Sequence, residues 1–202
     1  MPGRRSESPS RKVTKVTTAT EQDVIDLLLA QHNQIKTMFA EVAAARGERR
    51  RELFNDLVRL LAVHEAAEEQ VVHPAARSKA GDEVVEARLH EEDEAKHALS
   101  DLYDLGVDHP EFDTRLAALE KAVVDHATHE EREEFPRLRQ DTSPERLRRM
   151  AGAVRAAEAI SPTRPHPGAG ESATANMLVG PPVAVFDKIR DAVRDWRQSN
   201  RD

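Results

Sequence analysis

Two short segments of this chain carry the same chemistry-bearing residues at the same offsets. HEAAEEQVVHP occupies residues 64–74 and HATHEEREEFP occupies residues 126–136, and both read H-x3-E-E-x4-P. A histidine and a glutamate four residues apart share one face of a helix, so an imidazole and a carboxylate can bind the same ion. Imidazole and carboxylate ligands without sulfur suit iron, manganese or zinc. The repeat therefore suggests two halves of a metal site, carried on two helices.

The spacing of these residues from the apolar stripes predicts which of them face inward. His64 lies seven and three residues after leucines of its stripe, and Glu68 follows one turn later. His126 and Glu130 stand in the same relation to the apolar stripe of their own helix. His32 lies seven residues after one isoleucine and three before another, so it faces inward by the same criterion.

A lone inward histidine is usually a hydrogen-bonded core residue, and histidine–glutamate ion pairs alone could form a polar core. A buried carboxylate, however, costs several kcal/mol unless it is paired, protonated or bound to a metal. Two inward glutamates, each one turn after an inward histidine, with a third histidine nearby, favour a metal. Glutamates can bridge two ions in helical bundles. We therefore expect two iron ions, with zinc or manganese as alternatives.

The remaining polar residues of the repeat are expected to lie outside this site. His73 lies nine residues after His64, which in a regular α-helix places it half a turn away. Glu69, Glu131 and His129 are likewise expected to face solvent or the flank of their helices. The two prolines are expected to end or kink the helices.

Hydrophobic periodicity predicts an all-α fold, an up-down-up-down four-helix bundle with a C-terminal helical extension. The four helices are expected near residues 20–46, 48–74, 82–105 and 111–139. Thr20 is the expected N-cap of the first helix. A fifth helix is expected near residues 143–159, opened by the Ser143-Pro144 pair.

The chain divides into three predicted parts. Residues 1–18 are polar, basic and aperiodic, and are expected to be a disordered leader. Residues 19–140 form the bundle. Residues 141–202 form the helical extension, with a Pro/Gly-rich linker and a C-terminal amphipathic helix near residues 185–196. That helix is expected to dock on the bundle, and binding to a protein partner is the alternative.

Composition excludes several classes of function. There is no cysteine, so disulfides, thiolate metal sites and thiol catalysis are excluded. The formal net charge of -7 argues against a nucleic-acid partner, and no apolar run approaches the ~18 residues that a membrane span needs. A cytoplasmic location is the default expectation.

Over about residues 21–140 the chain resembles the hemerythrin-like (HHE cation-binding) family. The resemblance rests on His32 within LLLAQHNQIKTMF and on the two repeated segments. It implies a four-helix bundle with a non-haem di-iron site, bridged by oxo or hydroxo groups and by carboxylates. It also implies O2, another diatomic molecule or peroxide as the ligand. The ligands carried over from the family motif are His32, His64, Glu68, His126 and Glu130.

The third helix departs from the family pattern, which usually places an inward histidine there. In RLHEEDEAKHAL the inward position is Glu92, whereas His90 lies on another face. Glu92 is the favoured metal ligand on this helix. The alternatives are that His90 is the ligand or that the helix provides none. Arg88 or Lys96 could instead form an ion pair with Glu92. Three histidines and three glutamates would make a hard, anionic shell that favours Fe(III).

Three functions remain open from the sequence. The first is a di-iron binding protein for O2-linked or redox sensing or for iron handling. The second is an enzyme with peroxidase, ferroxidase or nitric-oxide-reducing activity at the same site. The third is a helical interaction module with a structural or degenerate metal site, whose protein partner the sequence does not identify.

Overall fold

The computed structural model describes residues 22–160, 187, 188 and 191, and all regular secondary structure in this part of the chain is helical. The expected all-α class is therefore confirmed. The long helices that carry the candidate ligands are α1 (Val24–Ala44), α2 (Gly47–Ala67), α4 (Asp82–Leu105) and α5 (Phe112–His129). The shorter elements are η1 (Glu68–Val72), α3 (His73–Ala80), η2 (Glu130–Glu134) and α6 (Phe135–Asp141), and α7 (Pro144–Ile160) follows them.

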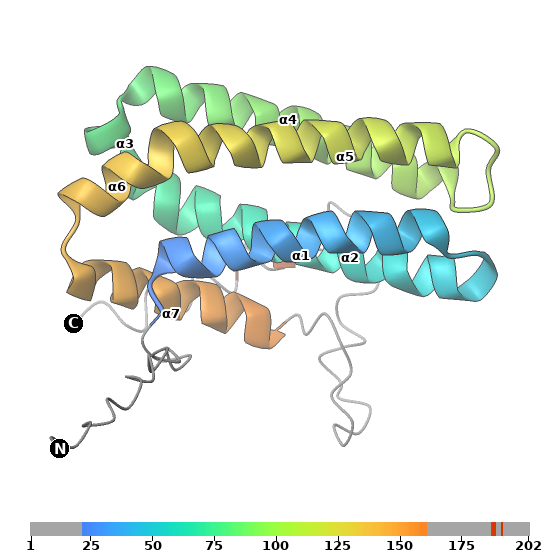
Figure 1. Cartoon of the computed structure of the whole chain (residues 1–202), viewed down its shortest axis with the longest axis horizontal. Coiled ribbons are helices and arrows are strands. Elements are labelled where there is room, and N and C mark those ends of the chain that lie inside the picture. The colour runs from blue at the N-terminus through green and yellow to red at the C-terminus, as the bar shows by residue number, and fades with distance from the viewer. Residues whose placement is uncertain (1–21, 161–186, 189–190, 192–202) are drawn as a thin grey trace, which may run out of the picture.

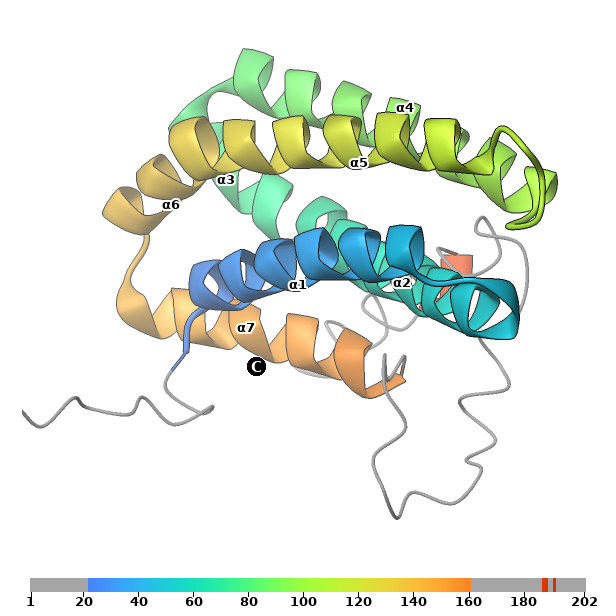
Figure 2. The same cartoon turned by 45° about the vertical axis from the view of Figure 1, so that its right-hand side comes forward.

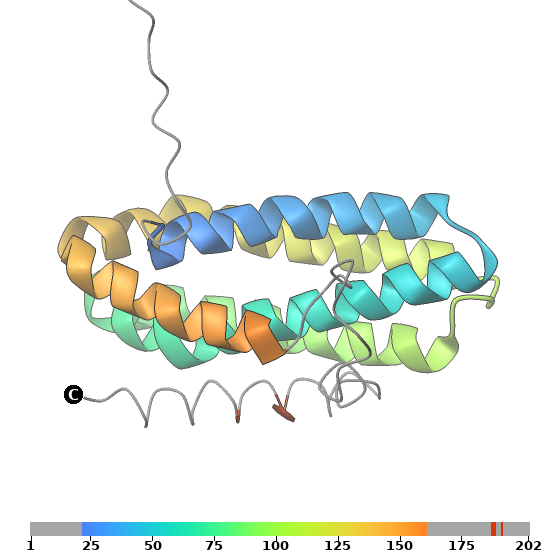
Figure 3. The same cartoon turned by 90° about the horizontal axis from the view of Figure 1, so that it is seen from below.

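The four long helices lie side by side along the long axis of the molecule (Figure 1). Helix α1 packs on α2, α4 packs on α5, and α1 also contacts α5. Figure 2 shows the α1–α2 pair between the α4–α5 pair and α7. Seen from below, α7 runs along the outer face of the α1–α2 pair, which it contacts through both helices (Figure 3).

Two wider π-helical turns interrupt the helices that carry the repeated motif. They are η1, between α2 and α3, and η2, between α5 and α6. Each ends just before a proline, Pro74 or Pro136, in the first turn of the next α-helix. Proline has no N–H and its ring clashes with the carbonyl four residues earlier, which disfavours a regular α-helical turn there. Where the prolines are expected to end or kink the helices, the structure has a π turn followed directly by a further α-helix, and π turns are often found at functional sites.

The end of the bundle far from these turns is held by aromatic and apolar packing. Phe54 and Phe112 pack edge to face with ring centroids 5.1 Å apart. The guanidinium of Arg50 lies 4.6 Å from the Phe112 ring centroid and also pairs with Asp113. The C-caps of helices α3 and α4 are Gly81 and Gly106, whose φ values of 99° and 82° are rarely adopted by residues that have a side chain.

Two helix bounds agree with those expected, whereas the second helical segment continues past Pro74 to the end of α3 at Ala80. The predicted helix at residues 82–105 coincides with α4, and α7 begins at Pro144 after a Ser143 cap that accepts from the Arg146 N–H. Helix α1 starts at Val24, and Asp23 is its N-cap.

Several expectations fall outside the described residues. These are the Thr20 cap, the leader over residues 1–18, the Pro/Gly-rich linker, and most of the C-terminal amphipathic helix. Among the described helices, none is both long and apolar enough to cross a bilayer.

Candidate metal centre

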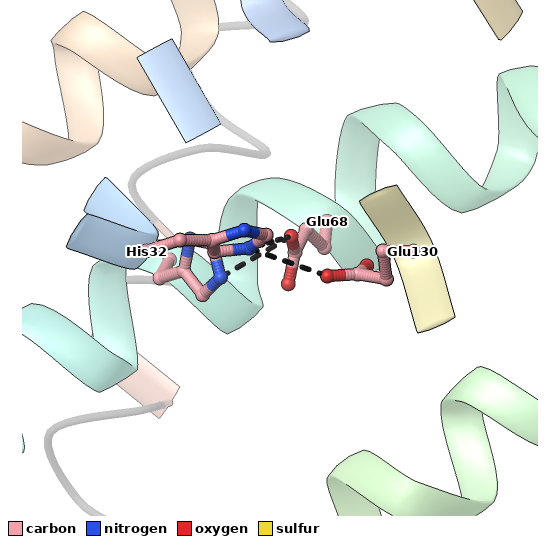
Figure 4. Close-up of side chains that lie close together, drawn as sticks. His32, Glu68 and Glu130 are labelled. Carbon is pink, nitrogen blue, oxygen red and sulfur yellow. Dashed lines mark ion pairs between the residues drawn. The ribbon is translucent and has the colours of Figure 1, made fainter. Parts of the chain in front are cut away.

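The structure brings the six sequence-predicted ligands together inside the bundle. Each is at most 4% exposed, and Glu68, Glu92 and Glu130 are fully buried. They come from α1, α2, η1, α4, α5 and η2, so every long helix contributes. Figure 4 shows His32 facing the carboxylates of Glu68 and Glu130.

Glu68 and Glu130 lie at the middle of this arrangement. The His64 Nε2 lies 3.3 Å from Glu68 Oε1, and the His32 Nε2 lies 3.4 Å from Glu130 Oε2. The His126 Nε2 lies 3.5 Å from Glu130 Oε2 and 4.0 Å from both Glu68 and Glu92. Imidazole nitrogens from three helices thus converge on two carboxylates.

The converging atoms form two overlapping groups of four, in each of which all ligand atoms lie within 4.8 Å of one another. One group joins His32 and His64 to Glu68 and Glu130, and the other joins Glu92 and His126 to the same two glutamates. Each of these groups could hold a cation, and Glu68 and Glu130 belong to both groups.

The central atoms also lack the hydrogen bonds that burial ordinarily requires. Both oxygens of Glu68, both oxygens of Glu130, and the Nε2 atoms of His32 and His126 are buried without a hydrogen-bond partner among the described residues. Each such atom costs about 1–3 kcal/mol if nothing binds it. Because these atoms converge on one region, the residues present are suited to binding a cation there.

The outward-facing nitrogens of the imidazoles, by contrast, are all engaged. Each buried histidine pairs its Nδ1 with a neighbouring side chain and turns its Nε2 toward the carboxylates of the cluster. The Nδ1 pairs are His32 with Glu131 at 2.8 Å, His64 with Gln31 at 2.9 Å, His126 with Glu91 at 3.0 Å, and His73 with Glu134 at 2.9 Å. Such outer partners fix the orientation and tautomer of metal-binding histidines.

His73 belongs to the site, contrary to the sequence-based expectation. It is 2% exposed, and its Nε2 is hydrogen-bonded to Glu92. It also forms a third ligand group with Glu130 and Glu134. The expectation assumed a regular α-helix between His64 and His73, whereas η1 adds one residue to the intervening turn. That addition rotates His73 by about 100°, toward the interior.

Glu131, Glu69 and His129 are partly exposed, as expected for residues on the flanks of their helices, but two of them make contacts that the sequence did not indicate. Glu131 contacts His32 Nδ1 with a side chain that is 34% exposed, and Glu69 pairs with Lys96. His129 is 43% exposed and bonds to Glu91, as a residue on the flank would. The spacing of Glu131 gave no signal of this contact, because Glu131 also lies in a π turn.

On α4 the structure favours Glu92 over His90. Glu92 is fully buried in the second ligand group, whereas His90 is 74% exposed and pairs with Glu94. Lys96 does approach Glu92, at 3.5 Å, but Arg88 pairs instead with other acidic side chains, Glu91 and Glu133.

The charges of the cluster strongly perturb its protonation. Burial opposes the charged form of His32, but the adjacent carboxylates of Glu130 and Glu68 outweigh burial and raise the pKa of His32 to about 10. For His73, Glu134 and Glu92 likewise outweigh burial and raise its pKa to about 11.

Burial is the largest influence on the pKa of two other groups in the cluster, His64 and Glu130. Burial lowers the pKa of His64 to about 3, despite the nearby charge of Glu68. Burial and the neighbouring Glu68 raise the pKa of Glu130 to about 7. Without an ion, protons on His32 and His73 therefore compensate part of the buried negative charge.

A small pocket opens beside the three inward histidines. His32, His64 and His126 line it together with Glu65, Lys36 and the aliphatic side chains of Ile35, Val123, Val124 and Ala127. Its free space suits a molecule of about the size of water.

Residues 23–138 match the Hemerythrin HHE cation binding domain family, and the chain belongs to this family. The fold and the buried histidine–glutamate groups agree with a cation-binding domain. The matched range ends before α7, which starts at Pro144.

Two individual proteins are similar to this chain. A crystal structure of a Hemerythrin HHE cation binding domain-containing protein from Mycobacterium kansasii superposes with a TM-score of 0.60 at 20% identity. That likeness covers 71% of this chain and 95% of the other. A protein of Nostoc sp. named DNA nickase is 27% identical over 147 residues, 72% of this chain. The match spans only 42% of that relative. Because the name of this relative refers to DNA, the expected absence of a nucleic-acid partner is not supported.

Proposed function

We propose that this protein binds two non-haem iron ions in the bundle and uses them in O2-linked or redox sensing or in iron handling. The observation that carries the proposal is the pair of four-residue ligand groups sharing Glu68 and Glu130, whose buried oxygens have no hydrogen-bond partner among the described residues. Histidine and carboxylate ligands without sulfur suit non-haem iron.

In this proposal Glu68 and Glu130 would contribute to both metal positions, because both belong to each ligand group. His32 and His64 would hold the ion at the first position, and His126 and Glu92 the ion at the second. His73 completes the second position, because its Nδ1 is held from outside in the same way as in the other three histidines. The set then comprises four histidines and three glutamates, which is one imidazole more than the set expected from sequence, with the same three carboxylates.

An iron pair supplies one-electron chemistry and open positions for a small ligand such as O2, another diatomic molecule or peroxide. The protein itself supplies burial, oriented imidazoles and a pocket of about water size. These features support a sensing or iron-handling role. The rival role, a peroxidase, ferroxidase or nitric-oxide reductase, needs turnover at the same site.

Iron content and the near-ultraviolet and visible spectrum test the proposal. The native protein is expected to hold about two irons per chain, and Glu92→Gln about one. Glu94→Gln on the same helix is the matched control, because Glu94 is 69% exposed, and it should hold as much iron as the native protein. Fewer than one iron per native chain would overturn the di-iron proposal. Sustained turnover of peroxide or Fe(II) would assign the enzyme role instead.

A role on DNA is the second candidate, and it rests on the Nostoc relative named DNA nickase. The match leaves more than half of that relative outside this chain, so the activity in the name need not lie in the shared part. Incubating iron-loaded protein with supercoiled plasmid tests this candidate directly. Conversion to open circles that requires the protein and its intact ligands would support it; unchanged plasmid would remove it.

A further inference from the structure

Helix α7, outside the range matched by the family, is connected to one candidate ligand by a chain of two hydrogen bonds. The amide Nε2 of Gln31, on α1, donates to Glu158 Oε1, on α7, at 2.9 Å. The Oε1 of the same amide lies 2.9 Å from the Nδ1 of His64, on α2. Gln31 is 3% exposed, so the connection runs through the interior.

The chemistry of the three groups makes this chain directional. A carboxylate accepts hydrogen bonds and does not donate them, so Glu158 requires the NH2 side of the Gln31 amide. The amide oxygen must then face His64, whose Nδ1 must carry the proton. The lone pair of His64 is thereby left on Nε2, which lies 3.3 Å from Glu68 in the centre.

The other three histidines of the site do not need such a relay. Their Nδ1 atoms face the carboxylates of Glu131, Glu91 and Glu134, which accept in either orientation. An amide, however, offers a donor or an acceptor depending on which way it turns. Of the four buried imidazoles, only His64 therefore relies on a second residue to select its tautomer.

We infer that Glu158 is a positioning residue, which acts through Gln31 to hold His64 in the tautomer whose Nε2 can bind an ion. The inference rests on the proposed function in that His64 is taken as a ligand of the first metal position. It assigns a purpose to α7: the helix that covers the α1–α2 pair also sets the coordination chemistry beneath it.

The tautomer of His64 can be read in the metal-free protein by long-range 1H–15N NMR of the imidazole. The native protein is expected to show the proton on Nδ1. In Glu158→Lys the introduced ammonium only donates, so the amide of Gln31 should turn and place its NH2 against His64. The proton should then move to Nε2. Glu145→Gln, an exposed change at the start of α7, should leave the native signal unchanged.

A rescue variant separates this relay from general damage to α7. Adding Gln31→Glu to Glu158→Lys supplies a carboxylate that accepts from both the lysine and His64, so the Nδ1–H tautomer should return. In iron titrations, Glu158→Lys should weaken the first position about 10-fold, as loss of an outer partner typically does. The double variant should recover most of that loss.

Two results would overturn the inference: a native His64 protonated on Nε2, or a Glu158→Lys protein whose tautomer and iron affinity match the native ones. Failure of the native protein to bind iron would instead overturn the proposed function. The metal-free NMR measurement would still report whether the relay exists.

Discussion

Replacing His73 by alanine probes the residue that the sequence placed outside the site. His73 is buried between Glu92 and Glu134, both fully buried, and bonds to each through one ring nitrogen. Its removal leaves two buried carboxylates without their shared cation. Breaking a buried ion pair in this way costs about 3–5 kcal/mol. For a chain of this size, that corresponds to a fall in Tm of about 6–20 °C.

The measurement is thermal unfolding of metal-free protein, followed by circular dichroism at pH 8 and pH 5.5. The loss in His73→Ala should be smaller at pH 5.5, because the stranded carboxylates can take up protons there. Iron content should also fall from about two ions per chain to one. His90→Ala is the control: its side chain is 74% exposed, and the change in unfolding free energy should stay within about 0.5 kcal/mol.

The reasoning about His73 fails if His73→Ala melts within 2 °C of the native protein, a margin set by the roughly 2–4 °C expected per kcal/mol. It also fails if the variant retains both irons. A variant that melts lower but keeps both irons would leave His73 as a structural partner of Glu92 and remove it from the ligand set.

Three further predictions concern the bridge, the far end of the bundle and pH. Glu68→Gln should lower the iron content at both metal positions, whereas Glu69→Gln should leave it unchanged. Elemental analysis of the two purified proteins measures this, and equal losses of iron would contradict the bridging role of Glu68. Arg50→Ala should cost about 1–3 kcal/mol in urea unfolding, through the lost Phe112 contact and ion pair, with iron content unchanged; a drop in iron would contradict the separation of the two ends. Metal-free protein should lose stability as pH rises from about 7 to 10, because the folded-state pKa of His32, about 10, lies above its ordinary 6.5. Its charged form stabilises the fold fully below pH 6.5, and that contribution is lost through pH 10; flat urea midpoints across this range would refute the assignment.

Much of the candidate site followed from helical phase. His32, His64 and His126 were identified because each falls on an apolar stripe of its own helix, and the structure buries all three. Glu92 was identified in the same way, against a nearby histidine that the structure leaves exposed. Whether these residues bind metal stays a prediction, but their convergence needed only the 3.6-residue period.

The residues that sequence reasoning missed lie in or beyond the π turns. His73 and Glu131 were assigned with α-helical geometry, which no longer holds once one extra residue enters a turn. The proline after each motif was the sequence signal of an irregular turn, and it was interpreted only as the end or a kink of the helix. Contacts such as that between Gln31 and Glu158 join residues far apart in sequence, so no local pattern could reveal them.

Each π turn also changes which residues face the core on its two sides. Residues before η1 and those after it lie on helices that are offset by about one residue around the axis, and η2 introduces the same offset in its own helix. Deleting one residue from a π turn would therefore not merely shorten the chain. It would rotate everything downstream, turning His73 toward solvent and exposing the core side of α3. Any redesign of this protein must therefore assign core-facing and solvent-facing positions separately before and after each π turn.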